Sequence, residues 1–212
     1  MKNTKKFILV GGGGHCKSVI EAIESIDGTI IGILDSCEKS GSFVLGYPIL
    51  GSDNLIPQYI NECEFLVTVG QIKNAIVRMK LHHLIKKFDG KLATIIASSA
   101  IVSKHAKLGE GTIILHQAII NAGSNIGIGC IINTHATIEH DVIIEDFCHI
   151  STGAIINGGC RIASECFIGS QSVIINGIQI SKQSIIGAGS IVRKDISANG
   201  IYVGTNNIKK IF

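Results

Sequence analysis

The chain has no tryptophan, only 5% aromatic residues and two prolines among 212 residues. A core built on large rings is therefore excluded, and aliphatic side chains must fill the interior. Although 46% of the residues are hydrophobic, no apolar stretch approaches the ~18 residues that a membrane-spanning helix needs. The net charge is only +3, and no basic run or basic–aromatic alternation indicates nucleic-acid binding.

The seven cysteines show no metal-site or disulfide pattern, because their number is odd and no CxxC pair occurs. Four of them, Cys130, Cys148, Cys160 and Cys166, occupy positions of a small-residue repeat, where cysteine acts as a compact hydrophobe. We expect buried, reduced thiols and no metal. The apolar run Phe7–Val10 is too short for a signal peptide and glycines follow it at once, so we expect a cytoplasmic protein.

An aliphatic residue recurs at every sixth position from Val102 to Val192, sixteen times without a break. A period of six fits neither an α-helix nor a two-faced strand, but it is typical of a hexapeptide solenoid, a parallel β-helix. Four residues after each aliphatic stands a second position, which is small in thirteen of fifteen hexads. We predict a triangular prism of about five coils with both series inside. The tail after Val192 should cap the open end or pack on the outside.

Residues 1–97 follow a different pattern, in which short apolar strands alternate with amphipathic helices. The order predicts an α/β, Rossmann-like domain with a doubly wound parallel sheet, followed by the β-helix domain over residues 98–212. A loop is expected from Ser36 to Gly51. The expected strands are Phe7–Val10, Thr29–Leu34, Phe65–Val69 and Leu92–Ile96, and the expected helices are Lys17–Ile26 and Ile72–Phe88.

A glycine run, Gly11–Gly14, and His15 connect the first strand to the first helix. Backbone N–H groups at such a helix start hold anions, and glycine lets a ligand approach the main chain. The dinucleotide fingerprint GxGxxG needs glycine where Cys16 stands, which disfavours nicotinamide. Ligands bind beyond the carboxyl ends of such strands, so the loop, Asp35 and Gly70 should surround one pocket. We interpret it as a nucleotide or nucleotide-sugar site; a tight turn without a ligand stays open.

The densest polar segment of the solenoid is 133–141, where His140 stands beside Asp141. A base next to a carboxylate suits proton transfer, but adjacent side chains on a strand point apart, so contact needs a bend or a neighbouring subunit. His135 and His140 are also spaced like two zinc ligands of the γ-class carbonic anhydrases. Ser99 stands where the third ligand belongs, which argues against zinc hydration chemistry.

Over its whole length the chain resembles the bacterial sugar acetyltransferases that join a small Rossmann-like domain to a left-handed hexapeptide β-helix. This group includes the UDP-4-amino-sugar N-acetyltransferases of the bacillosamine type, the perosamine N-acetyltransferases and the sialic acid O-acetyltransferases. The resemblance is carried by FILVGGGGHCKSVI, LDS, LVTVG, INTHATIEHDVIIEDFCHISTGA and GAGSIVRKDI with YVG near the end. The pairing of GGGGH with IEHD and FCHISTGA is more specific than the hexads.

The resemblance implies an acetyl-CoA donor in a groove between neighbouring solenoids of a homotrimer, and a UDP-linked amino sugar as acceptor. It implies that His140 is the catalytic base, with Asp141 as its acidic partner, and that no covalent intermediate forms. It places His149 and a backbone N–H near Gly158 at the thioester, and Asn133 at the acceptor. The matching nucleotide-sugar positions are Gly11, Gly13, Gly14, His15, Asp35 and Gly70.

Two segments depart from the family pattern. Cys16 and Lys17 follow the loop histidine where glycine or alanine is usual at the first position, and the tail reads VGTNNIKKI instead of VGxPAK. The leading hypothesis is N-acetylation of a UDP-linked 4-amino-4,6-dideoxy sugar. O-acetylation of sialic acid or a related nonulosonate by the same His140 stays open. A non-catalytic, trimeric nucleotide-sugar-binding scaffold that does not bind acetyl-CoA also stays open.

Overall fold

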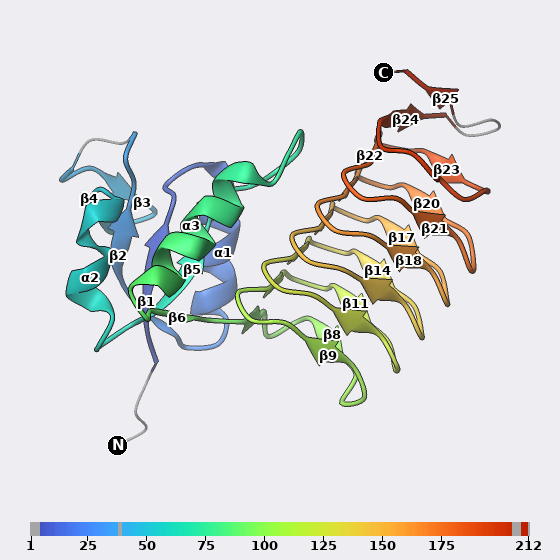
Figure 1. The fold of residues 1–212 in the computed structure, drawn as a ribbon. Coiled ribbons are helices and arrows are strands. Elements are labelled where there is room, and N and C mark those ends of the chain that lie inside the picture. Colours follow the sequence, from blue (N-terminus) through green and yellow to red (C-terminus); the bar gives the residue numbers. More distant parts are fainter. Residues whose placement is uncertain (1–4, 38–39, 205–208, 212) are drawn as a thin grey trace.

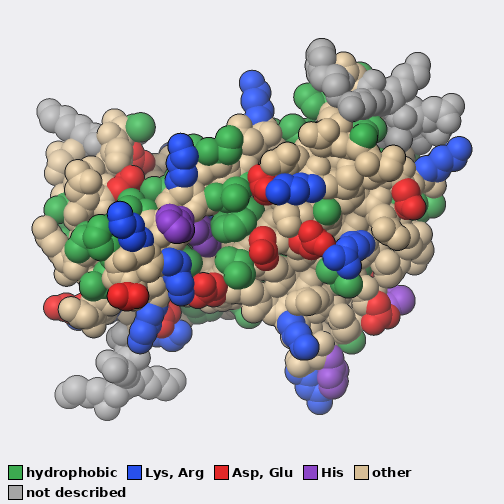
Figure 2. Space-filling view, viewed as in Figure 1, with side chains coloured by type: hydrophobic (Ala, Val, Ile, Leu, Met, Phe, Trp, Pro, Cys, Tyr) green, Lys and Arg blue, Asp and Glu red, His purple; other side chains and the backbone are tan. Residues whose placement is uncertain are grey.

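The structure is a computed structural model that describes residues 5–37, 40–204 and 209–211. An N-terminal α/β domain lies beside a stack of coils, and the chain ends at the far end of that stack (Figure 1). Charged side chains of both signs are scattered over the visible face, in line with the small net charge (Figure 2). No helix within the described ranges is long and apolar enough to cross a membrane.

The N-terminal domain contains the expected doubly wound sheet, with strand order β3-β4-β2-β1-β5-β6. All its pairs are parallel except the hairpin β3–β4. The strands are β1 Lys6–Val10, β2 Thr29–Leu34, β3 Phe43–Val44, β4 Tyr47–Gly51, β5 Glu64–Val67 and β6 Lys91–Leu92. The helices are α1 Gly14–Glu24, α2 Ile56–Tyr59 and α3 Ile76–Lys87, and a 3-10 turn covers Asp53–Leu55.

Four sequence predictions for this domain are corrected. The first helix covers Gly14–Glu24 instead of Lys17–Ile26, so Gly14 and His15 lie in its first turn. The expected loop at 36–51 contains the hairpin β3–β4, because Leu45 and Gly46 adopt the positive φ values of a tight hairpin turn and Ile49 is buried against the sheet. The second long helix begins at Ile76, four residues later than expected. The expected strand 92–96 is split, since β6 ends the first sheet at Leu92 and β7 joins the solenoid at Ile95.

The predicted hexapeptide β-helix is confirmed, with strands of two residues that repeat every third strand and form three faces. The first face contains β7 Ile95–Ile96, β10 Ile113–Ile114, β13 Ile131–Ile132, β16 His149–Ile150, β19 Phe167–Ile168 and β22 Ile185–Ile186. The second face contains β8 Ile101–Val102, β11 Ile119–Ile120, β14 Thr137–Ile138, β17 Ile155–Ile156, β20 Val173–Ile174 and β23 Ile191–Val192. The third face contains β9 Lys107–Leu108, β12 Asn125–Ile126, β15 Ile143–Ile144, β18 Arg161–Ile162 and β21 Gln179–Ile180.

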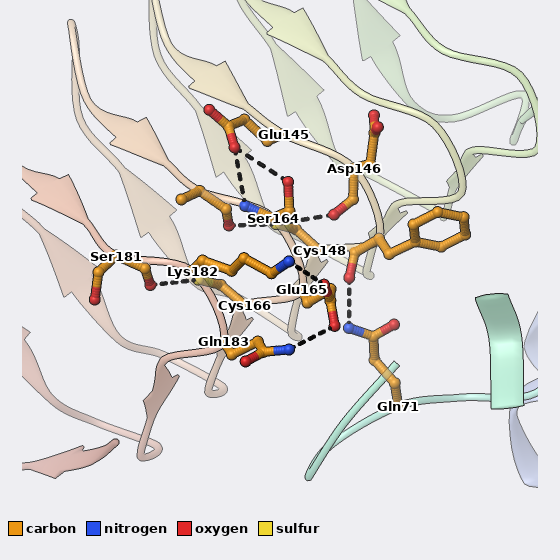
Figure 3. A network of polar contacts seen from close by, with 12 residues as sticks. Gln71, Glu145, Asp146, Cys148, Ser164, Glu165, Cys166, Ser181, Lys182 and Gln183 are labelled. Carbon is orange, nitrogen blue, oxygen red and sulfur yellow. Dashed lines mark hydrogen bonds and ion pairs between the residues drawn. The ribbon is translucent and has the colours of Figure 1, made fainter. Parts of the chain in front are cut away.

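Both sequence series point into the prism, and the sixth-residue aliphatics from Ile114 onward are buried. The small series also has a polar function. Thr112 donates a hydrogen bond to the carbonyl of Gly127 at 2.7 Å, and Cys166 donates to that of Ser181 at 3.2 Å (Figure 3). Each hydroxyl or thiol of this kind satisfies a carbonyl fifteen residues further along the chain. Serine, threonine and cysteine therefore serve here as small donors to inward-facing carbonyls.

The chain after Val192 adds to the third and first faces at the end of the stack, and the expected cap stays a prediction. Ile196 bridges to Ile180, and β24 Ile201–Val203 adds to β22 in parallel. The short strand β25 Lys209–Lys210 then pairs with β24 in antiparallel fashion. Of the departing VGTNNIKKI tail, residues 205–208 lie outside the described residues.

Ile132 tests the inward assignment, because its side chain is fully buried in the prism. The substitution Ile132→Asp places an unpaired carboxylate there, and we expect a loss of about 4 kcal/mol or more in the free energy of unfolding, measured by urea titration. Ile143→Asp on the outside of the third face is the control and should cost about 1 kcal/mol or less. An unchanged unfolding midpoint for Ile132→Asp would contradict the assignment.

Candidate active site

One side of the glycine loop between β1 and α1 packs against the rest of the N-terminal domain, and the other side is open. Gly11 has a φ of 111°, and a Cβ atom there would lie 2.5 Å from Cγ2 of Val69. The Gly12 N–H donates to Oδ2 of Asp35 at 2.6 Å, so Asp35 anchors the loop. A Cβ atom at Gly13 or Gly14 would meet no heavy atom within 4 Å. The backbone at the start of α1 therefore faces open space, where a ligand can approach.

Two adjoining cavities share this loop. One has a volume of about 390 Å³ and lies within the N-terminal domain, where Gly13, Asp35 and Gly70 are among its lining residues. The other has a volume of about 770 Å³ and lies between the domain and the coils. Its solenoid wall is made by Asn133, Thr134, His149 and Thr152, and its domain wall includes Gly14, His15 and Gly70.

His15 stands at the junction of the two cavities. Its Nε2 atom is buried and has no hydrogen-bond partner among the described residues. Burial lowers the pKa of His15 to about 3, with further contributions from the positive charge of Arg78 and from His149. A neutral imidazole ring takes part in hydrogen bonds but not in ion pairs.

His149 lies in β16 on the outside of the first face and is locked by two hydrogen bonds. Its Nδ1 lies 2.7 Å from the backbone oxygen of Gln71, which can only accept, so Nδ1 carries the proton. Nε2 accepts from Nδ2 of Asn133 at 3.1 Å. Burial lowers the pKa of His149 to about 4, although the Gln71 bond opposes the shift. Both ring nitrogens thus have partners within the chain, and the expected contact of His149 with the thioester stays a prediction.

The side chains of His140 and Asp141 are in contact, because the chain bends between them as the sequence analysis required. They lie in the turn between β14 and β15, where Asp141 adopts a φ of 60°. This turn brings His140 Nδ1 to 2.8 Å from Asp141 Oδ2 within one chain. Both side chains are well exposed, at 63% and 72%.

Gly158 lies beneath the His140 ring in the next coil. A Cβ atom at Gly158 would lie 2.7 Å from Nε2 of His140, so only glycine leaves room for the ring in this position. Gly158 is buried, and its N–H has no acceptor among the described residues. The predicted roles of His140, Asp141 and Gly158 in catalysis stay predictions.

The predicted site residues form two groups at different edges of the prism. Asn133 follows β13, so it lies at the edge between the first and second faces, beside the two cavities. His140 and Gly158 follow β14 and β17, so they lie at the edge between the second and third faces. The second face separates the groups, and neither cavity has His140, Asp141 or Gly158 in its wall.

The second face is apolar on its outside, whereas the third is mainly polar. The outward residues of the second face are Ile101, Ile119, Thr137, Ile155, Val173 and Ile191. Ile101 is 64% exposed and Ile155 is 37% exposed. The third face instead carries ion pairs such as Arg161–Glu145, and Glu165 binds Lys182 at 3.0 Å nearby (Figure 3). A row of exposed aliphatic side chains is typical of a protein interface.

Sequence reasoning missed two residues that support the cavity wall, Gln71 and Arg78. Gln71 Nε2 donates to the carbonyl of Phe147 at 2.7 Å (Figure 3), and Arg78 donates to carbonyls of both domains. The one available signal was that an arginine falls in register with the buried face of α3. Within the described part of the chain, no group of three or more histidine, cysteine or acidic side chains is arranged to hold a metal ion.

The buried His82 and His149 and the half-buried His15 link folding stability to pH. Burial lowers the pKa of His15 and His82 to about 3 and that of His149 to about 4, from an ordinary 6.5. As the pH falls below 6.5, the unfolded chain binds protons that the folded chain does not. Stability is therefore complete above about pH 7 and decreases toward pH 4, by up to about 1.4 kcal/mol per pH unit for each histidine.

His82→Gln removes one of these titrations without touching either cavity. We expect the free energy of unfolding, measured by urea titration between about pH 7.5 and about pH 5, to fall less steeply than in the wild type. His83→Gln changes the exposed neighbouring histidine and should keep the wild-type slope. Equal slopes for His82→Gln and wild type would show that folding does not lower the pKa of His82.

Comparisons with known proteins agree with this architecture. The model of the PglD N-terminal domain family matches residues 6–84. A mutant perosamine N-acetyltransferase from Caulobacter crescentus, solved with CoA and GDP-perosamine, is 30% identical, with 96% of each chain covered and a TM-score of 0.90. The acetyltransferase domain of PglB from Neisseria gonorrhoeae, in complex with acetyl coenzyme A, is 28% identical, with 99% of this chain and 100% of that chain covered and a TM-score of 0.90.

WeeI from Acinetobacter baumannii shares the fold at 23% identity, with 98% of this chain and 100% of that chain covered and a TM-score of 0.88. No curated protein matches the chain. The coil stack, the glycine loop domain and the 30% identity over nearly the whole length lead to one assignment. The chain belongs to the bacterial sugar acetyltransferases that join a PglD-type N-terminal domain to a hexapeptide-repeat β-helix.

Proposed function

We propose that this protein transfers the acetyl group of acetyl-CoA to the amine of a UDP-linked 4-amino-4,6-dideoxy sugar, as a homotrimer with a site at each subunit interface. The observation that carries the proposal is the position of the two groups of site residues. The cavities lie at one edge of the apolar second face, and His140 lies at the other.

A three-fold arrangement would bring these groups together. If three prisms meet through their second faces, the edge of one that carries His140 lies beside the edge of the next that carries Asn133. The exposed aliphatic row of the second face, including Ile101 and Ile155, would be buried by this assembly. Each subunit would then supply the cavity of one site and the base of another.

The His140–Asp141 pair suits the removal of a proton from an attacking amine. The Asp141 carboxylate accepts from Nδ1–H of His140, which leaves the lone pair on Nε2. The neutral amine attacks the thioester carbon, becomes cationic and gives a proton to Nε2. The thioester C–S bond then breaks, and the CoA sulfur leaves as a thiolate and takes up a proton. The free N–H of Gly158 would stabilise the negative charge on the carbonyl oxygen.

The N-terminal cavity fits the nucleotide end of the acceptor. The open backbone of Gly13 and Gly14 at the start of α1 offers N–H groups to a diphosphate, and the neutral ring of His15 lines both cavities. Two relatives support the substrates, because one was solved with acetyl coenzyme A and the other with CoA and GDP-perosamine. The second relative makes a GDP-linked amino sugar the alternative acceptor. The cytoplasmic location expected from the sequence stays a prediction.

Mass spectrometry after incubation with acetyl-CoA and an amino sugar linked to UDP or to GDP tests the proposal. A gain of one acetyl group on the UDP-linked sugar is the expected result. Transfer to the GDP-linked sugar alone would correct the nucleobase. Bound acetyl-CoA without transfer to either amine would contradict N-acetylation and favour a hydroxyl acceptor. Failure to bind acetyl-CoA would favour the scaffold hypothesis.

Replacement of the base gives a sharper expectation. His140→Ala should lower kcat by about 100-fold or more, because no group remains to accept the amine proton, while oligomeric state and binding of both substrates persist. The control is His105→Ala, which changes another exposed histidine at the same edge of the prism and should leave kcat unchanged. Near-normal turnover by His140→Ala would move the base elsewhere.

A further inference from the structure

Arg78 is the largest fully buried side chain in the described part of the protein. It lies on α3, and the hydrogen bonds of its guanidinium all go to backbone carbonyls. Nη1 donates to Val67 at 2.8 Å and to Val69 at 2.7 Å, at the end of β5. Nη2 donates to Gly129 at 3.0 Å, in the turn between β12 and β13 of the solenoid. Arg78 thus ties the N-terminal sheet to one coil.

The guanidinium of Arg78 is positively charged, and none of the described carboxylates forms an ion pair with it. Burial lowers the pKa of Arg78 only to about 10, so the side chain is charged at neutral pH. Burying a charge without a counter-ion is unfavourable, and apolar packing would join two domains more cheaply. The planar fork of arginine, which reaches three carbonyls at once, indicates a geometric role.

Val69, whose carbonyl Arg78 binds, directly precedes two residues of the cavity wall. Gly70 and Gln71 follow Val69, and the Gln71 carbonyl accepts from Nδ1–H of His149 at 2.7 Å. His149 Nε2 then accepts from the Asn133 amide, whose Oδ1 accepts from the Thr134 N–H at 2.8 Å. Arg78 is therefore connected to Asn133 by a hydrogen bond to Val69, by the backbone of residues 69–71, and by the hydrogen bonds of His149 to Gln71 and Asn133.

We propose that Arg78 is a positioning residue for the acceptor cavity. Arg78 holds the segment 69–71, so that the Gln71 carbonyl fixes His149 in its Nδ1–H form, and His149 in turn orients Asn133. The role rests on the proposed function, since an oriented wall matters for turnover only if the amino sugar binds against it. The charge of Arg78 also contributes, after burial, to lowering the pKa of both His15 and His149. Both rings therefore remain neutral hydrogen-bonding groups.

The ¹⁵N NMR signals of the His149 ring report this role without any substrate. We expect Nδ1 protonated and Nε2 unprotonated in the wild type at neutral pH, and a mixture of tautomers in Arg78→Met. Arg78→Lys keeps the charge but lacks the planar fork, so it should show a smaller change in the same direction. The control, Arg161→Met, removes an exposed arginine of the third face and should leave the spectrum unchanged.

Kinetics provide the second readout. Arg78→Met should raise KM for the amino sugar at least about tenfold, because the buried hydrogen bonds that hold the segment 69–71 are lost, and should change kcat less. Wild-type His149 that is charged or carries its proton on Nε2 would overturn the proposal even if no variant folds. An unchanged His149 spectrum in folded Arg78→Lys or Arg78→Met would also overturn it. If the spectra are as expected but the protein acetylates no amino sugar, the proposed function is contradicted, whereas the role of Arg78 in positioning His149 is not.

Discussion

The packing of one aliphatic and one small residue on each side of the prism is the constraint on which the structure depends. These two residues fill the interior, so the remaining side chains of each hexad point outward or lie in turns. A turn then recurs at the same edge in every coil, and neighbouring coils place functional residues at the same edge. His140 and Gly158 meet in this way, eighteen residues apart in the chain and one coil apart in the stack.

The same constraint divides the site. A residue that follows a first-face strand cannot reach the edge where His140 stands, because the whole second face lies between them. The N-terminal domain packs at the first face, so it completes the cavity there and leaves His140 exposed. Two incomplete halves separated by an apolar surface are consistent with an oligomeric enzyme whose subunits complete each other.

The periodic part of this fold was readable from the sequence, because each hexad makes its own contacts with the hexads one coil away. The glycine loop was readable for a similar reason, since a strand, glycines and a helix follow one another directly. The hairpin β3–β4 was missed because a proline and a glycine-rich segment favour a loop locally, whereas the burial of Ile49 against β2 stabilises a strand. The Asp141 bend was left open although a signal was present, because position 141 shares the six-residue register of Gly123, Gly129, Gly153 and Gly159, which also have a positive φ.

The wall of the cavity was the least predictable part. The tautomer of His149 depends on a backbone carbonyl from a residue 78 positions earlier, and the hold on that carbonyl depends on Arg78. Neither contact follows from spacing along the chain, because the first joins the two domains and the second depends on the packing of α3 against the end of β5. Sequence motifs identified the residues that face the ligand, and the structure adds the residues that hold them in place.

Subunit complementation tests the central claim most directly. His140→Ala and Asn133→Ala would each be purified, shown to be inactive, and then unfolded and refolded together. If each site combines the cavity of one subunit with His140 of the next, mixed trimers should regain up to about a quarter of the wild-type rate, because about a quarter of the interfaces pair two intact halves. If the mixed trimers form and stay inactive, the site lies within a single chain and the account is wrong.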